Sequence, residues 1–236
     1  MNKTFAISKL NLRQIRAAYI ITGIVFILLL ASYVLIILIP GSGGGSSGGG
    51  SSNDNSTVSA GNALVLLPIF AAIFIPAKNL RKTINLGVRR IDFFKGCIPI
   101  YVILSAAVSF VVILFHYAVD PFMSNHFGVL DMSAAFGFLS RGFGVAFVQM
   151  FAFLLLASAF AHTLSLAQGA WYGWLADAVL IAIICVFTPI PFLRAAEVWF
   201  FNLIIFGNPG LQIAACVVIA AALYALSRPV LNRRRL

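Results

Sequence analysis

The sequence predicts an all-α integral membrane protein with six transmembrane helices and an amphipathic helix before the first of them. Of its 236 residues, 61% are hydrophobic and only 9% are charged, whereas soluble proteins carry about 25% charged residues. The charges lie between apolar runs that are long enough to cross a hydrocarbon core, which takes about 20 helical residues. These runs lack the alternation of barrel strands. A cytosolic enzyme and a disordered chain are therefore excluded.

Six apolar runs define the expected spans, and flanking charges bound each run. The spans are residues 17–39, 60–77, 98–119, 142–166, 171–186 and 211–226. The connecting segments are 40–59, 78–96, 120–141 and 187–210, followed by a basic tail at 227–236. The first span exceeds the apolar core of a typical signal peptide, and no A-x-A site follows it, so we expect a retained anchor.

The two segments that flank the first span differ in composition. In residues 1–16, Lys9, Arg13 and Arg16 share one side of a helix, which predicts an amphipathic elbow helix in the membrane interface. The alternative is a basic flank that only fixes orientation. Residues 41–52 form a Gly/Ser tract, which predicts a flexible tether of either native or engineered origin.

The basic residues predict the orientation of the chain. All but two of the 16 Lys and Arg residues fall in the 1–16 segment, the 78–96 loop and the 227–236 tail, leaving Arg141 and Arg194 for the other side. Loops rich in Lys and Arg stay in the cytoplasm. We therefore expect a multi-pass protein of the cell membrane with both termini cytoplasmic, and the net charge of +10 does not indicate nucleic-acid binding.

Motifs for cofactors are missing from the sequence. Cys97, Cys185 and Cys216 lie singly in apolar stretches, so neither a disulfide framework nor a cysteine-based zinc site is expected. No Gly-x4-Gly-Lys-[Ser/Thr] sequence occurs, and the chain therefore has no P-loop for ATP. We expect the chain itself to bind no cofactor.

The 78–96 loop carries the most informative pattern. Leu80, Ile84, Val88 and Ile91 form one apolar stripe among basic residues, which predicts a short amphipathic helix at the cytoplasmic surface. Such a helix suits contact with another protein. The alternative is a basic loop that only fixes the topology.

Residues 86–94, with the sequence LGVRRIDFF, resemble a pattern that follows the second span of ABC-2 type permeases, the membrane subunits of a class of ABC transporters. Arg89 stands where that family more often has a small polar residue. The layout is similar as well, because these permeases have an elbow helix, six spans and cytoplasmic termini. The apolar segment 187–210 resembles the family's short re-entrant helices before the last span.

The resemblance implies that residues 78–96 form a cytoplasmic coupling helix, which docks on a separate ABC ATPase subunit where ATP binds. Val88 would fill an apolar groove of that ATPase. A second permease subunit, identical or related, would complete the pathway. The residues expected in the ATPase contact are Ile84, Gly87, Val88, Arg89, Arg90 and Phe93.

Four polar residues gather near the outer end of the third span. His116, Asp120, His126 and Asp131 offer ligand types that suit a metal ion. Their spacing matches no metal-binding motif. The sequence therefore favours ordinary loop polarity at this place.

Isolated polar residues within the other spans have structural and functional interpretations. Asp177 near the start of the fifth span either snorkels to the interface or belongs to a transport pathway. Gln149 predicts an interhelical hydrogen bond and is a second pathway candidate. Arg141 and His162 are expected at the membrane interfaces.

The leading hypothesis from the sequence is therefore a transport subunit without enzymatic activity of its own. Because the ABC-2 permeases are mostly exporters, we expect a hydrophobic or amphipathic cargo such as a peptide, lipid or drug. A non-catalytic membrane scaffold or assembly factor is the main alternative. A membrane-embedded enzyme is less favoured, since the sequence shows no convincing nucleophile–base pair.

Overall fold

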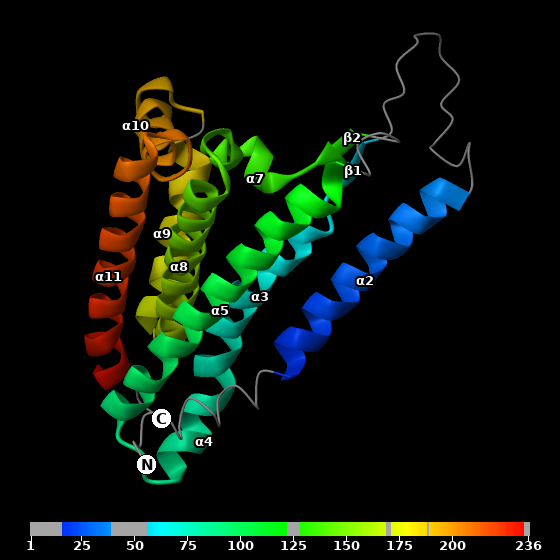
Figure 1. The fold of residues 1–236 in the computed structure, drawn as a ribbon. Coiled ribbons are helices and arrows are strands. Elements are labelled where there is room, and N and C mark those ends of the chain that lie inside the picture. Colours follow the sequence, from blue (N-terminus) through cyan, green and yellow to red (C-terminus); the bar gives the residue numbers. More distant parts are fainter. Residues whose placement is uncertain (1–15, 39–55, 122–127, 169–170, 188, 234–236) are drawn as a thin grey trace.

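The chain folds into a bundle of long helices with a small two-stranded sheet at one end (Figure 1). The computed structural model describes residues 16–38, 56–121, 128–168, 171–187 and 189–233. The expected elbow helix, apart from Arg16, and the Gly/Ser tract lie outside these residues.

Four helical segments in the described part are long and apolar enough to cross a membrane. The first is continuous from Gly61 to Asn85 and joins α3 (Gly61–Phe74), the π-helical η1 (Ile75–Asn79) and α4 (Leu80–Asn85). The others are α5 (Arg90–Ala118), α8 (Phe143–Ala167) and most of α11 (Pro209–Arg233). By length and composition the chain has the helices of a multi-pass membrane protein, and the predicted all-α class is confirmed apart from two short strands.

Two further apolar helices accompany the four long ones. They are α2 (Arg16–Leu38) and α9 (Trp171–Phe187), whose described apolar stretches are the shorter Ala18–Ala31 and Trp171–Ile183. The short elements are β1 (Ser56–Val58), β2 (Gly128–Leu130), α7 (Met132–Ala135), η2 (Phe138–Arg141), α10 (Pro191–Phe201) and η3 (Asn202–Phe206).

The core forms where α3, α5 and α11 pack around α8. α2 lies along α3, and α9 contacts α8 and α10 at the edge of the bundle. None of the residues of α10 is buried. The largest fully buried side chains come from the central helices and η2, and they include Phe93, Tyr101, Phe138, Met150 and Leu154.

The two ends of the bundle differ in charge. We call the end that carries α4 and the last turns of α11 the basic end, and the end with β1, β2, α7 and α10 the opposite end (Figure 1). Only Arg141 and Arg194, among the described Lys and Arg residues beyond α2, belong to the opposite end. The basic end holds Lys78, Arg81, Lys82, Arg89, Arg90, Lys95 and Arg228.

The segment 78–96, where the sequence predicts a loop with one short amphipathic helix, instead consists of the ends of two long helices joined by a turn. The helix from α3 continues to Asn85 and α5 begins at Arg90, which leaves residues 86–89 as the turn. Leu80 and Thr83 are buried, and the Thr83 hydroxyl donates a hydrogen bond to the Asn79 carbonyl at 2.7 Å. The helix therefore extends beyond the apolar run because packing continues beyond it.

Candidate functional sites at the two ends of the bundle

The turn at residues 86–89 is an exposed feature of the basic end. Gly87 has a φ of +80°, a conformation that favours glycine, and its N–H donates to the Ile84 carbonyl at 2.8 Å. This closes α4 and turns the chain toward α5. The Leu86 side chain is 72% exposed, so an apolar group stands at the tip of a basic surface.

The structure separates five of the six residues expected in the ATPase contact into two groups. Gly87 and Arg89 are exposed on the turn. Ile84 and Val88 pack against the core, and Phe93 is fully buried. The apolar stripe of the sequence therefore largely serves the chain's own packing, and the exposed apolar residue that sequence reasoning did not select is Leu86.

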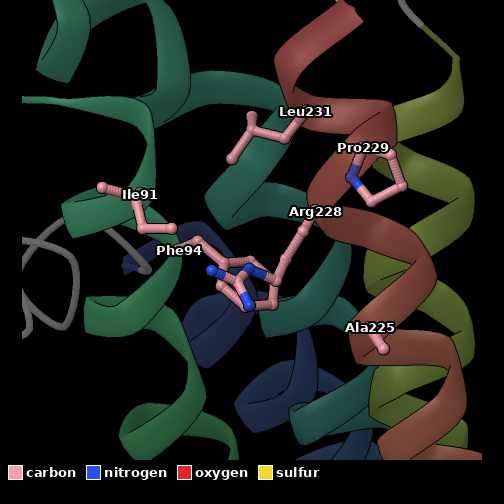
Figure 2. Close-up of a pocket in the computed structure, with 6 residues that line it drawn as sticks. All are labelled: Ile91, Phe94, Ala225, Arg228, Pro229 and Leu231. Carbon is pink, nitrogen blue, oxygen red and sulfur yellow. The ribbon is translucent and has the colours of Figure 1, made fainter.

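Arg90 joins the start of α5 to the end of α11. Its Nη1 donates a hydrogen bond to the Leu231 carbonyl at 3.0 Å, which satisfies a carbonyl near a helix terminus. Beside this bond lies a pocket of about 340 Å³ between the two helices. Figure 2 shows its lining residues, which are Ile91, Phe94, Ala225, Arg228, Pro229 and Leu231.

The two candidate pathway residues lie in different surroundings. Gln149 is buried and its amide donates a hydrogen bond to the Gln212 side chain, so it makes the interhelical contact expected of it between α8 and α11. Asp177 is half-buried and accepts a hydrogen bond from the Gln168 side chain. These bonds join helices, and a role of either residue in transport stays a prediction.

His162, which the sequence places near the end of a span, is buried between helices and only 1% exposed. Its Nδ1 is 2.9 Å from the Tyr101 hydroxyl, and its ring lies within 6.0 Å of those of Phe94 and Tyr224. The rings of Tyr101 and Tyr224 are stacked at 6.3 Å. We call these four residues the ring cluster, and it holds α5, α8 and α11 together on the basic side of the bundle.

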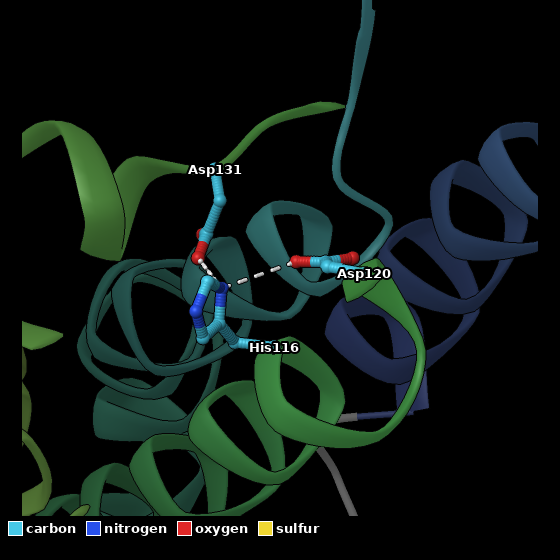
Figure 3. Close-up of side chains that lie close together, drawn as sticks. All are labelled: His116, Asp120 and Asp131. Atoms are coloured by element: carbon cyan, nitrogen blue, oxygen red, sulfur yellow. Dashed lines mark ion pairs between the residues drawn. The ribbon is translucent and has the colours of Figure 1, made fainter. Parts of the chain in front are cut away.

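The opposite end brings together three of the four residues considered as metal ligands. His116 lies near the end of α5, Asp120 one turn later, and Asp131 between β2 and α7 (Figure 3). The His116 Nδ1 is 2.7 Å from Asp131 Oδ2 and 3.5 Å from Asp120 Oδ2. His126 lies outside the described residues. We call His116, Asp120 and Asp131 the acid–histidine cluster.

Hydrogen bonds from neighbouring segments hold both carboxylates in place. The Ser59 hydroxyl lies 3.1 Å from each oxygen of Asp120, and the backbone N–H of Ser133 donates to Asp131 at 3.1 Å. Burial raises the pKa of Asp120, and the nearby Asp131 raises this pKa further, while Ser59 and His116 lower it. The cluster therefore combines buried negative charge with fixed geometry.

The short sheet is what carries Asp131 to the end of α5. β1 and β2 pair in parallel, with Ser56 opposite Gly128, and the Asn62 side chain continues the link by donating to Leu130 and accepting from Met132, both at 3.1 Å. No pattern in the sequence indicates this long-range pairing, and Ser59, Asn62 and Ser133 were not predicted.

Comparisons with known proteins add no assignment to these sites. No family model, curated protein or solved structure matches the chain, so every functional inference rests on its own residues and geometry.

Proposed function

We propose that the chain is the membrane-spanning permease subunit of an ABC transporter, and that a separate ATPase subunit docks on the 86–89 turn. The observation that carries the proposal is this turn, which presents the exposed Leu86 side chain among basic residues between two long apolar helices. The resemblance of residues 86–94 to the docking segment of ABC-2 type permeases supports the same assignment.

The orientation belongs to this proposal. Lys and Arg concentrate at the basic end, and such loops stay in the cytoplasm. With α2 and α9 counted as spans beside the four long helices, the chain crosses the membrane six times. α10 and η3, which lie between α9 and α11, then correspond to the re-entrant segment at the extracytoplasmic surface.

The geometry of the turn suits the transfer of motion from a partner. α4 and η1 continue into α3 without a loop, and α5 starts directly after the turn. A displacement of residues 86–89 therefore acts on the ends of two helices that span the bundle. Transport would require the ATPase to bind the turn differently in its two nucleotide states, since a partner with equal affinity for both conformations shifts nothing.

The pathway would form between this chain and a second permease subunit, either identical or related. The exposed apolar residues of α10, such as Phe192 and Trp199, favour contact with lipid or with that subunit. A hydrophobic or amphipathic cargo fits the apolar character of the bundle, and export is the direction that the family resemblance favours.

The decisive experiment replaces Leu86 by Asp in the full chain and measures capture of the proposed ABC ATPase subunit, together with stimulated ATP hydrolysis. Leu86 is chosen over Val88 because Val88 packs against the core, and its replacement would also disturb the fold. Burial of an unpaired carboxylate in the docking groove costs several kcal/mol. We expect binding to fall at least about tenfold.

The matched control is Asn85→Asp, which adds the same charge one residue earlier on the exposed surface but keeps the apolar side chain of Leu86. We expect this variant to bind the ATPase nearly as the wild type does. Normal capture and normal stimulation in well-expressed Leu86→Asp protein would contradict docking at the turn, and the scaffold hypothesis would then replace the transporter.

A further inference from the structure

The acid–histidine cluster has the donor set of a metal site. Three residues supply one ligand atom each, and the three atoms lie within 4.8 Å of one another. Ligands of a transition metal ion with bonds of about 2.1 Å lie roughly 3 to 3.5 Å apart. A small adjustment of the three side chains therefore places all donors around one ion.

The charges of the cluster are unbalanced. The side chains of Asp120 and Asp131 are only 6% and 4% exposed, and within the described residues His116 is the sole basic side chain that pairs with them. Two buried carboxyl groups thus share a single imidazole. Buried charges of this kind are normally paired or bound to a metal.

The ring nitrogen gives a second, independent observation. The Nδ1 of His116 is buried, yet it makes no hydrogen bond, although a carboxylate oxygen lies 2.7 Å away. A ring N–H at Nδ1 therefore does not point at that oxygen, and the contact between the two groups is an ion pair without hydrogen-bond geometry. A cation held between the two carboxylates would take Nδ1 as a third ligand.

A second layer of hydrogen bonds fixes the proposed ligands. Ser59 donates to Asp120, and Ser133 donates to Asp131 through both its backbone N–H and its hydroxyl. Such bonds keep carboxylates ionised and oriented toward a metal. Asn62 holds the backbone of β2 and α7 beside them.

We propose that His116, Asp120 and Asp131 bind a divalent transition metal cation such as Zn²⁺ at the opposite end of the bundle. One imidazole with two carboxylates suits such an ion, whereas Ca²⁺ takes six to eight oxygen ligands. The His116 side chain is 26% exposed, which leaves the cluster within reach of solvent. The bound ion would fasten the end of α5 to the β2–α7 connection, independently of any transport function.

The test is isothermal titration of the full chain in detergent, purified through a tag without histidine and freed of metal by EDTA. We expect one Zn²⁺ per chain with a dissociation constant near or below about 10 μM, and no comparable heat with Ca²⁺. The variants Asp120→Asn and His116→Ala should weaken zinc binding by about a hundredfold or more, since loss of a mere supporting group already costs 10 to 100-fold.

Glu197→Gln is the matched control, because it removes an acid from α10 at the same end and should bind zinc as the wild type does. X-ray absorption of the zinc-loaded wild type supplies a readout that needs no variant, and we expect one imidazole among oxygen ligands. An ion pair without a metal site is the competing outcome. Zinc binding that is absent, unaffected by both ligand variants, or free of imidazole scattering would overturn the proposal.

Discussion

The two ends of the bundle are held together by different kinds of contact. On the basic side, the ring cluster packs Phe94, Tyr101, His162 and Tyr224 with one side-chain hydrogen bond among them. At the opposite end, ion pairs, serine hydroxyls and a parallel strand pair link distant segments. Aromatic packing tolerates small sliding motions, whereas hydrogen-bonded charges accept few geometries. We therefore expect the opposite end to be the fixed one and the basic end to move.

The difference also concerns what each end exposes. The basic end presents the turn with Leu86 and Gly87, and the pocket beside Arg228. At the opposite end the side chains of Asp120 and Asp131 are buried. A surface for a changing partner thus lies at the basic end, away from the buried ion pairs of the opposite end, and binding regions often come from the less stable parts of a fold.

The comparison depends most strongly on whether the two ends lie on opposite sides of the membrane. In a chain whose Cys97, Cys185 and Cys216 are replaced by Ala, single cysteines at Lys82 and Arg194 report the two ends, since both residues are exposed. We expect a membrane-impermeant maleimide to label position 194 in intact cells and position 82 only after permeabilisation. The reverse pattern would invert the orientation, and labelling of both from outside would end the comparison.

Removal of one carboxylate tests whether the opposite end depends on its charges. Asp131→Ala removes the cap that accepts from Ser133 at the start of α7 and leaves His116 without its closest partner. We expect a loss of about 3 kcal/mol in the free energy of unfolding, measured by thermal unfolding in detergent with EDTA present.

The matched variant at the basic end is Asp92→Ala, in the first turn of α5. An acid at that position interacts with the helix dipole and contributes less than about 1 kcal/mol. Equal losses for Asp92→Ala and Asp131→Ala would show that the two ends do not differ in their dependence on charge.

Tyr101→Phe tests how much the single side-chain hydrogen bond of the ring cluster contributes to stability. The variant keeps the ring contacts but removes the hydroxyl that bonds His162, and the buried Nδ1 then loses its partner. We expect a loss of about 2 kcal/mol, again from thermal unfolding. Tyr117→Phe is the control, because that side chain is 46% exposed and its replacement should change stability by less than about 0.5 kcal/mol. An unchanged Tyr101→Phe variant would reduce the ring cluster to apolar packing alone.

The smallest effect is expected at the turn itself. Gly87→Ala forces a residue with a Cβ into a φ of +80°, which costs about 1 kcal/mol. The control Gly144→Ala lies in the first turn of α8, where a Cβ meets nothing within 4 Å, and should be neutral or stabilising by up to about 1 kcal/mol. Equal melting temperatures of the two variants would contradict the strained turn.

The long apolar helices could be predicted from the sequence because their signal is local. The expected span at 142–166 differs from α8 (Phe143–Ala167) by one residue at each end, since Gly142 and the apolar run mark the boundary directly. The expected loop at 78–96 was too long, because flanking charges were used to end the helices. Burial of Leu80 and Thr83 decides that boundary, and burial depends on tertiary packing.

Only part of the acid–histidine cluster could be predicted from the sequence, for the same reason. The spacing of His116 and Asp120 by four residues already places both on one face of a helix. The arrival of Asp131 depends on the pairing of β1 with β2, which no local pattern predicts. The position of His162 along α8 could be predicted in the same way, whereas the helices that surround it could not.

The π-helical turn η1 explains why the buried residues around it recur every four residues, although an α-helix has 3.6 residues per turn. Pro68, Ala72, Pro76 and Leu80 are all inaccessible to solvent at strict intervals of four. In a regular α-helix each such step overshoots a full turn by about 40°, so these four residues would spread over about 120° of the helix surface. A π turn takes up one additional residue and cancels about 100° of this drift. The turn therefore lets one face of the helix stay buried on both sides of η1.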